Sequence, residues 1–137
     1  MPIYSWEIKT PASTEQKIRK EIEGDYITKV RVRFPPGPTG LLKVAFFYGE
    51  MQIFPYESGT YFQGDDEVIE WDEYFKMHEK PFPLTIYCKN EDDTYEHSVY
   101  IIVVTKYSEE LLGEIIAKAI AKKLSGLYRA ITGVFRW

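Results

Sequence analysis

The sequence predicts an all-β antiparallel sandwich, similar to a jelly roll, followed by a C-terminal amphipathic α-helix. Up to Lys106 the apolar residues alternate with a period of two, the period of a half-buried strand, whereas from Ser108 onward they recur every three or four residues, as in a helix. Regularly spaced short strands over about 100 residues are typical of a sandwich or barrel. We therefore divide the chain into a β-sandwich domain at 1–107 and a helical segment for packing or assembly at 108–137.

Each strand is predicted from alternation and from the turn residues that bound it. Residues 3–8 alternate, and residues 26–34 do so most clearly, with Val30, Val32 and Phe34 on one face and three basic residues on the other. Residues 16–23 fit either a strand or a helical stripe, and we assign a strand because the neighbouring segments are strands. The remaining strands, rich in β-branched and aromatic residues, are expected at 41–48, 51–54, 61–62, 67–75, 84–89 and 95–105.

Two connections are predicted by their residue types. Tyr48–Met51 contains Gly49 and reads as a tight hairpin, and Asn90–Thr94 is a polar loop between two strands.

The Pro- and Gly-rich stretch 35–40 contains a Pro-x-x-Pro spacing, which is a ligand motif for domains with aromatic-lined grooves. A rigid connection between two strands explains it better, because proline cannot donate to a strand ladder.

The helix is expected to begin at Ser108, which can cap it, and to run to about residue 124. Acidic residues near its start and lysines further on suit the helix dipole. Gly126 and Gly133 weaken the far end, so a second short or continuing turn is expected beyond 124. The apolar residues form one broad stripe, and we expect its members and the C-terminal aromatic residues to make an assembly interface: Leu111, Leu112, Ile115, Ile116, Ile120, Leu124, Leu127, Phe135 and Trp137.

Composition limits the class of protein. The chain has 137 residues, 45% hydrophobic and 28% charged, which suits one globular core without disulfides. The single Cys88 excludes a disulfide-framed scaffold, and we expect a soluble protein because neither a membrane-spanning run nor a signal peptide is visible. Asn and Gln are scarce while Glu and Lys are plentiful, a bias reported for proteins from hot environments.

The charge is unevenly distributed along the chain. Residues 1–49 carry a net charge of +3, residues 50–97 carry −10 and residues 98–137 carry +3. Such asymmetry suits contacts between copies or with other charged proteins, and it argues against nucleic acid as the main partner. A solvated acidic face without any partner remains the alternative.

No motif for catalysis or for a cofactor is present in the sequence. His78 and His97 are the only histidines and lack a metal-ligand spacing, and Cys88 has no second cysteine for a zinc site. The acidic loops 64–67 and 90–93 could offer oxygen ligands to Ca²⁺, but turns favour Asp and Asn for backbone reasons alone. We therefore expect a non-enzymatic protein without cofactor or metal. An enzyme would need a pocket that brings a histidine together with a carboxylate.

Aromatic residues are dense between positions 46 and 75, and two interpretations stay open. They can supply the core or an interface of a small sandwich. Alternatively, exposed rings at Tyr61, Trp71 and Tyr74 could stack on sugars, which would make the protein a carbohydrate-binding or host-attachment module.

The apolar stripe of the helix also allows several roles. It could cover an open face of the sandwich, pair with other copies, or dock on another protein. An interfacial helix on an anionic membrane is a further alternative, disfavoured by the three acidic residues in its first turns.

Segments 27–42, 52–55, 64–66 and 87–97 resemble small all-β structural proteins of tailed phages, proviruses and related viruses. The resemblance implies a jelly roll in a shell, neck or tail assembly, located in the virion after synthesis in the host cytoplasm. It carries over no catalytic residue and implies that His97 and loop 90–93 are framework features of a hairpin. We therefore expect a virion structural protein that assembles as a symmetric oligomer with itself and with other virion proteins.

Overall fold

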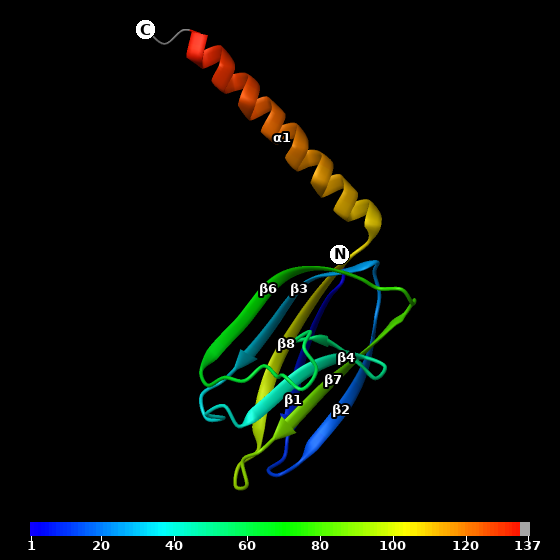
Figure 1. Cartoon of the computed structure of the whole chain (residues 1–137), viewed down its shortest axis with the longest axis vertical. Coiled ribbons are helices and arrows are strands. Elements are labelled where there is room, and N and C mark those ends of the chain that lie inside the picture. The colour runs from blue at the N-terminus through cyan, green and yellow to red at the C-terminus, as the bar shows by residue number, and fades with distance from the viewer. Residues whose placement is uncertain (135–137) are drawn as a thin grey trace. The chain divides into compact units, whose positions relative to one another are not determined.

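The computed structural model describes the backbone of residues 1–134 and the side chains up to residue 131. Two compact units follow one another along the chain, with the boundary between Lys106 and Tyr107. The first unit contains the strands and the second the helix (Figure 1). In chain order the elements are β1 (Ile3–Thr10), β2 (Glu15–Ile22), β3 (Tyr26–Phe34), β4 (Leu42–Tyr48), β5 (Met51–Phe54), β6 (Glu67–Lys76), β7 (Phe82–Asn90), β8 (His97–Lys106) and α1 (Ser108–Val134).

The strands of the first unit form two antiparallel sheets. One has the order β1-β8-β3-β6 and the other β2-β7-β4-β5. Apart from the β4–β5 hairpin, successive strands are assigned to alternate sheets, so the two sheets face each other in the arrangement of an eight-stranded jelly roll. The predicted fold class, an antiparallel jelly-roll sandwich followed by a helix, is confirmed.

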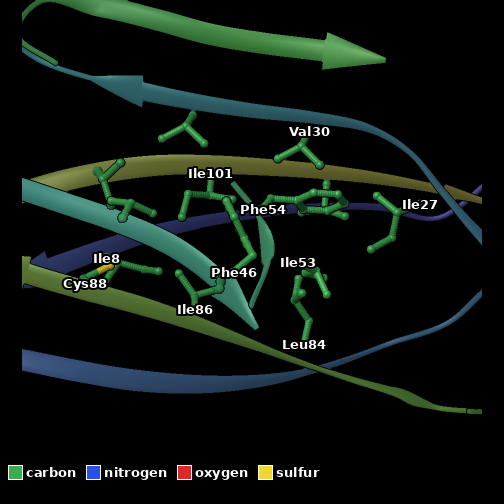
Figure 2. Packing of buried hydrophobic residues seen from close by; sticks show 14 of the residues in the cluster. Ile8, Ile27, Val30, Phe46, Ile53, Phe54, Leu84, Ile86, Cys88 and Ile101 are labelled. Atoms are coloured by element: carbon green, nitrogen blue, oxygen red, sulfur yellow. The ribbon is translucent and has the colours of Figure 1, made fainter. Parts of the chain in front are cut away.

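Alternation within each strand sends apolar side chains into the space between the sheets. On β3, Val30, Val32 and Phe34 are buried, while the basic side chains between them point outward. The inward side chains of both sheets meet in one core, which is drawn entirely from residues 8–103 (Figure 2). Phe46 and Ile86 are fully buried in this core, so residues 1–106 supply their own hydrophobic interior.

Residues 15–22, whose sequence fits either a helix or a strand, form a strand in the structure. They form β2, which pairs along its whole length with β7, and their inward residues Ile18 and Ile22 pack against the core. The tight hairpin at Tyr48–Met51 is also confirmed, with Gly49 at a φ of 60°. The predicted strand at 61–62 is wrong, because Phe62 makes only an isolated bridge to Val44.

The hairpin implied for His97 and loop 90–93 is wrong. β7 and β8 lie in different sheets, so the loop crosses from one sheet to the other instead of turning back beside the same strand. β8 pairs with β1 and β3, and β7 pairs with β2 and β4. The strand partners are chosen by long-range packing, which the local loop sequence does not record.

A close approach fixes the turn between β2 and β3. Gly24 has a φ of 120°, and a Cβ on this residue would lie 2.8 Å from the Thr105 hydroxyl oxygen. That hydroxyl donates to the carbonyl of Glu23. The turn therefore requires glycine for both backbone conformation and space.

The helix extends beyond residue 124, where its end was expected. It runs without interruption from Ser108 to Val134 and includes Gly126. One glycine in a helix interior costs only about 1 kcal/mol relative to alanine, which the surrounding helix formers outweigh. The main-chain NH of Tyr107 donates to the Glu110 carboxylate, which ties down the first turn.

Candidate functional site

The side chains expected to form an assembly interface lie along α1. Seven apolar side chains, which we call the apolar stripe, are each between 49% and 61% exposed: Leu112, Ile115, Ile116, Ile120, Leu124, Leu127 and Ile131. Leu111 is half-buried. Phe135 and Trp137, the other two predicted members, lie outside the described residues. Within its own unit, the helix thus leaves a row of apolar side chains uncovered.

The spacing of the apolar stripe places its members on one side of the helix. Most neighbours in the row are three or four residues apart, which is about one helical turn. A monomeric soluble protein rarely leaves such a contiguous apolar surface uncovered. The stripe therefore has the character of a surface that becomes buried on association.

The charges on α1 are divided between its two halves. Three glutamates occupy the first half, at positions 109, 110 and 114, whereas the four basic residues among the described side chains come later, at positions 118, 122, 123 and 129. The first turn is acidic where the helix dipole is positive, whereas the last turn contains no basic residue. The charge therefore changes sign along the helix, and the dipole is complemented at its N-terminal end.

The helix does not have the composition of a membrane-spanning segment. Among the residues that the structure describes, none of the helical segments combines the length and apolarity needed to cross a bilayer.

The structure does not bring the predicted sugar-stacking residues together. Trp71 and Tyr74 are three residues apart on β6, so they lie on opposite faces of that strand. Tyr74 is 64% exposed, whereas Trp71 is half-buried and packs against the core. Tyr61 lies elsewhere, with its ring centroid 5.8 Å from that of Tyr87 and with the Lys43 ammonium 5.6 Å from its ring. These residues form no common platform.

Two residues of the sandwich with nucleophilic or acid–base chemistry, Cys88 and His97, have structural roles, whereas His78 is exposed. Cys88 is fully buried in mid-strand, where burial raises the pKa of its thiol to about 12. His97 is buried as well, and its Nε2 lies 2.7 Å from Asp92 Oδ2. Main-chain hydrogen bonding from Thr94, followed by the hydrogen bond to His97, lowers the pKa of Asp92. This pair fastens the β7–β8 loop.

The acidic loops have internal partners as well. Asp65 Oδ1 accepts hydrogen bonds from the main-chain NH groups of Gly37 and Thr39, so this carboxylate holds the Pro- and Gly-rich connection in place. In the other loop Asp92 accepts from Thr94 and Tyr95. In the described part of the chain, no three His, Cys, Asp or Glu side chains are grouped as a metal site would require.

A pocket of about 400 Å³ lies at the edge of the sandwich between β5 and β6. Its walls are mainly aromatic, and the sequence indicated the density of these rings but not the pocket. Trp71, which was predicted as a stacking residue, lies in this wall. The lining residues are Met51, Gln52, Ile53, Phe54, Pro55, Tyr56, Phe62, Trp71, Glu73 and Phe75.

Comparisons with known proteins find similarity among solved structures alone. No protein-family model matches the sequence, and no curated protein matches it. Three solved structures illustrate the likeness: PliG of Aeromonas hydrophila, a periplasmic inhibitor of g-type lysozyme (10% identity, TM-score 0.44, 74% of this chain and 83% of that chain); the Yersinia pseudotuberculosis-derived mitogen (10%, 0.48, 76% and 86%); and the viral capsid protein STIV MCP (14%, 0.46, 83% and 52%). These similarities transfer no function to this chain.

Proposed function

We propose that this chain is a non-enzymatic structural protein whose jelly-roll unit is assembled into an oligomer through α1. The observation that carries the proposal is the apolar stripe, which stays about half exposed along the helix. The sandwich core is drawn from residues 8–103, so it does not depend on the stripe for its own interior. The stripe is therefore available to a partner.

A second copy of the chain is the partner that fits α1 best. When two helices lie antiparallel about an axis between residues 121 and 122, Glu114 of each copy lies level with Arg129 of the other, while Lys122 and Lys123 of the two copies lie near one another at the axis. When they lie parallel, like charges face each other along the whole length. An antiparallel pair also opposes the two helix dipoles, which is the favourable arrangement.

The spacing of the apolar stripe suits the same arrangement. With the two-fold axis between residues 121 and 122, Leu112 of one copy lies level with Ile131 of the other, and Ile116 lies level with Leu127. Four of the seven members of the stripe are paired in this way, as a two-fold symmetric interface requires, whereas Ile115, Ile120 and Leu124 lie level with Tyr128, Lys123 and Ala119.

The gross energy of such a contact is sufficient for association. Fully burying a Leu or Ile side chain contributes about 1.5–3 kcal/mol, so covering the exposed half of seven side chains on each of two helices contributes roughly 10–20 kcal/mol. The loss of translational and rotational freedom costs about 4–15 kcal/mol. The two ranges overlap and their midpoints favour a dimer, whose strength depends on how completely the stripe is covered.

The virion is the setting that we propose for this assembly. The fold alone does not decide it, because jelly rolls occur in capsid proteins, lectins and enzymes. The resemblance of segments 27–42 and 87–97 to small all-β proteins of tailed phages and proviruses supports a virion component. Repeated pairing between copies is the kind of contact from which a shell or tail is built.

Light scattering tests the proposal directly. The mass in solution is measured for the full chain and for a chain that stops after Tyr107, which retains the whole sandwich core. A defined oligomer for the full chain and a folded monomer for the shorter chain are expected. Stable monomers for both would refute self-assembly through α1.

A further inference from the structure

The edge pocket between β5 and β6 combines aromatic walls with one carboxylate. Phe54 contacts two rings of β6, with ring centroids 5.5 Å from Trp71 and 5.6 Å from Phe75. The ring centroid of Phe62 also lies 5.0 Å from that of Trp71. Figure 2 shows Phe54 among the buried side chains between the sheets. The rings therefore form a wall that is continuous with the core and is held in place by it.

Glu73 is an exception to the pattern of its strand. It shares one face of β6 with Trp71 and Phe75, which are its neighbours two positions away on either side. It is half-buried and lines the pocket. In the part of the chain that the structure describes, no lysine or arginine lies within ion-pair distance of it. Two other carboxylates of β6, at positions 70 and 72, point outward, where Lys29 pairs with both.

Of the other polar side chains of the lining, Tyr56 is 89% exposed and Gln52 is already occupied. The Gln52 amide nitrogen donates to the carbonyls of Pro55 and Thr60, and its oxygen accepts from the NH of Gly59. Gln52 therefore holds the loop after β5 and has little left to offer a ligand. Glu73 is the side chain with which the pocket can recognise charge.

We propose that this pocket binds an organic cation, an ammonium group carried on a short apolar chain. Ring faces attract a cation through their quadrupole, and a carboxylate in the same wall adds a full opposite charge. The apolar part of the ligand would lie against Phe54, Trp71 and Phe75, and its ammonium group would lie beside Glu73. This activity is independent of the assembly proposed for α1.

The lining disfavours other ligand classes. An anionic ligand would meet Glu73 inside a segment, residues 50–97, whose net charge is −10. A sugar would need several free hydrogen-bonding side chains, and Gln52 is already engaged. A neutral apolar molecule would partly desolvate the Glu73 carboxylate, whose Oε1 accepts a hydrogen bond from the main-chain NH of Tyr74, and would supply no opposite charge, which is unfavourable.

Binding can be measured with two small molecules of the same shape. Choline carries a trimethylammonium group, and 3,3-dimethyl-1-butanol replaces that group by a neutral tert-butyl group. The full-length protein is titrated with each, and the indole NH resonance of Trp71, assigned through Trp71→Phe, reports occupancy by NMR. Choline is expected to shift this resonance and to bind about tenfold more tightly than the alcohol.

Two variants distinguish an effect of the Glu73 carboxylate on binding from an effect of the overall charge of β6. Glu73→Gln keeps the size of the side chain and is expected to weaken choline binding about tenfold, without changing the affinity for the alcohol. Asp72→Asn removes the same charge from the opposite face of β6 and should leave both affinities unchanged. Unchanged amide spectra outside β5 and β6 verify that both variants fold.

Three results would overturn the proposal. Equal affinities for choline and the alcohol would make the pocket a neutral apolar site. Equal losses of choline affinity in Glu73→Gln and Asp72→Asn would show that long-range charge accounts for the binding and that contact with Glu73 does not. No shift of the Trp71 resonance up to 100-fold excess of choline over protein would mean that the pocket takes no ammonium ligand. None of these results depends on the oligomeric state.

Discussion

Replacing Ile116 by a charged residue should dissociate the α1 assembly. Ile116 lies near the middle of the apolar stripe and is 49% exposed. Covering that half contributes about 0.7–1.5 kcal/mol per copy, and a two-fold pair loses the contribution twice, or about 1.5–3 kcal/mol. Since 1.4 kcal/mol is a factor of ten, Ile116→Ala should weaken the dimer roughly 10- to 150-fold. Ile116→Asp buries an unpaired charge as well, so its effect should be larger.

Sedimentation velocity over a range of protein concentrations gives the dissociation constant of each variant. Ala121→Asp is the matched control, because it introduces the same charge into the same helix on the side away from the stripe. We expect this control to associate like the unmodified chain. Circular dichroism at 222 nm checks that the helix persists in each variant. If Ile116→Asp and Ala121→Asp kept the same dissociation constant as the unmodified chain, the stripe would not be the interface.

Three further predictions concern the sandwich. Ile86→Ala removes a fully buried side chain and should lower the free energy of unfolding by about 2–5 kcal/mol, measured by urea denaturation; a loss below about 1 kcal/mol would contradict the core packing. Cys88, with its pKa raised to about 12, should react with a disulfide reagent at pH 8 only after unfolding in guanidinium, and prompt labelling of the native protein would show that the thiol is accessible. Because the folded pKa of Asp92 is lowered, its ionised form stabilises the fold above the unfolded pKa of about 4, and this stability is lost as the pH falls below that value. Asp92→Asn should flatten the pH dependence of the melting temperature below pH 4, and an unchanged slope would refute the role of this carboxylate.

Local pattern was sufficient to predict most strands but not their partners. The alternation of Val30, Val32 and Phe34 reports which face of β3 is buried, because burial on one face of a sheet has a period of two. The loop after Asn90 is short enough for a hairpin, yet it joins strands of different sheets. Sheet assignment depends on contacts between residues far apart in the sequence, such as Ile8 on β1 with Val99 on β8, which no local window contains.

The candidate sites were predictable in part from the spacing of residues along a strand, because residues an even number of positions apart share a face and residues an odd number apart do not. Trp71 and Tyr74 have an odd separation on one strand, which places them on opposite faces, so their failure to form a stacking platform follows from the sequence itself. The same rule puts Glu73 beside Trp71 and Phe75. The sequence does not predict that β6 lies at the edge of its sheet, across from β5. At this edge the pocket opens between the two sheets. The pocket is a product of tertiary structure.

Because the charge changes sign along α1, the salt dependence of its association distinguishes parallel from antiparallel pairing. In an antiparallel pair salt screens both the attraction between Glu114 and Arg129 and the repulsion between the lysines near the axis, because exposed charges lose influence beyond about 8 Å at 0.15 M salt. The association should therefore change little with salt. In a parallel pair like charges repel along the whole helix, so salt would strengthen the association. Apolar burial gives the strength of the contact in either case, and strengthening by salt would identify the parallel geometry.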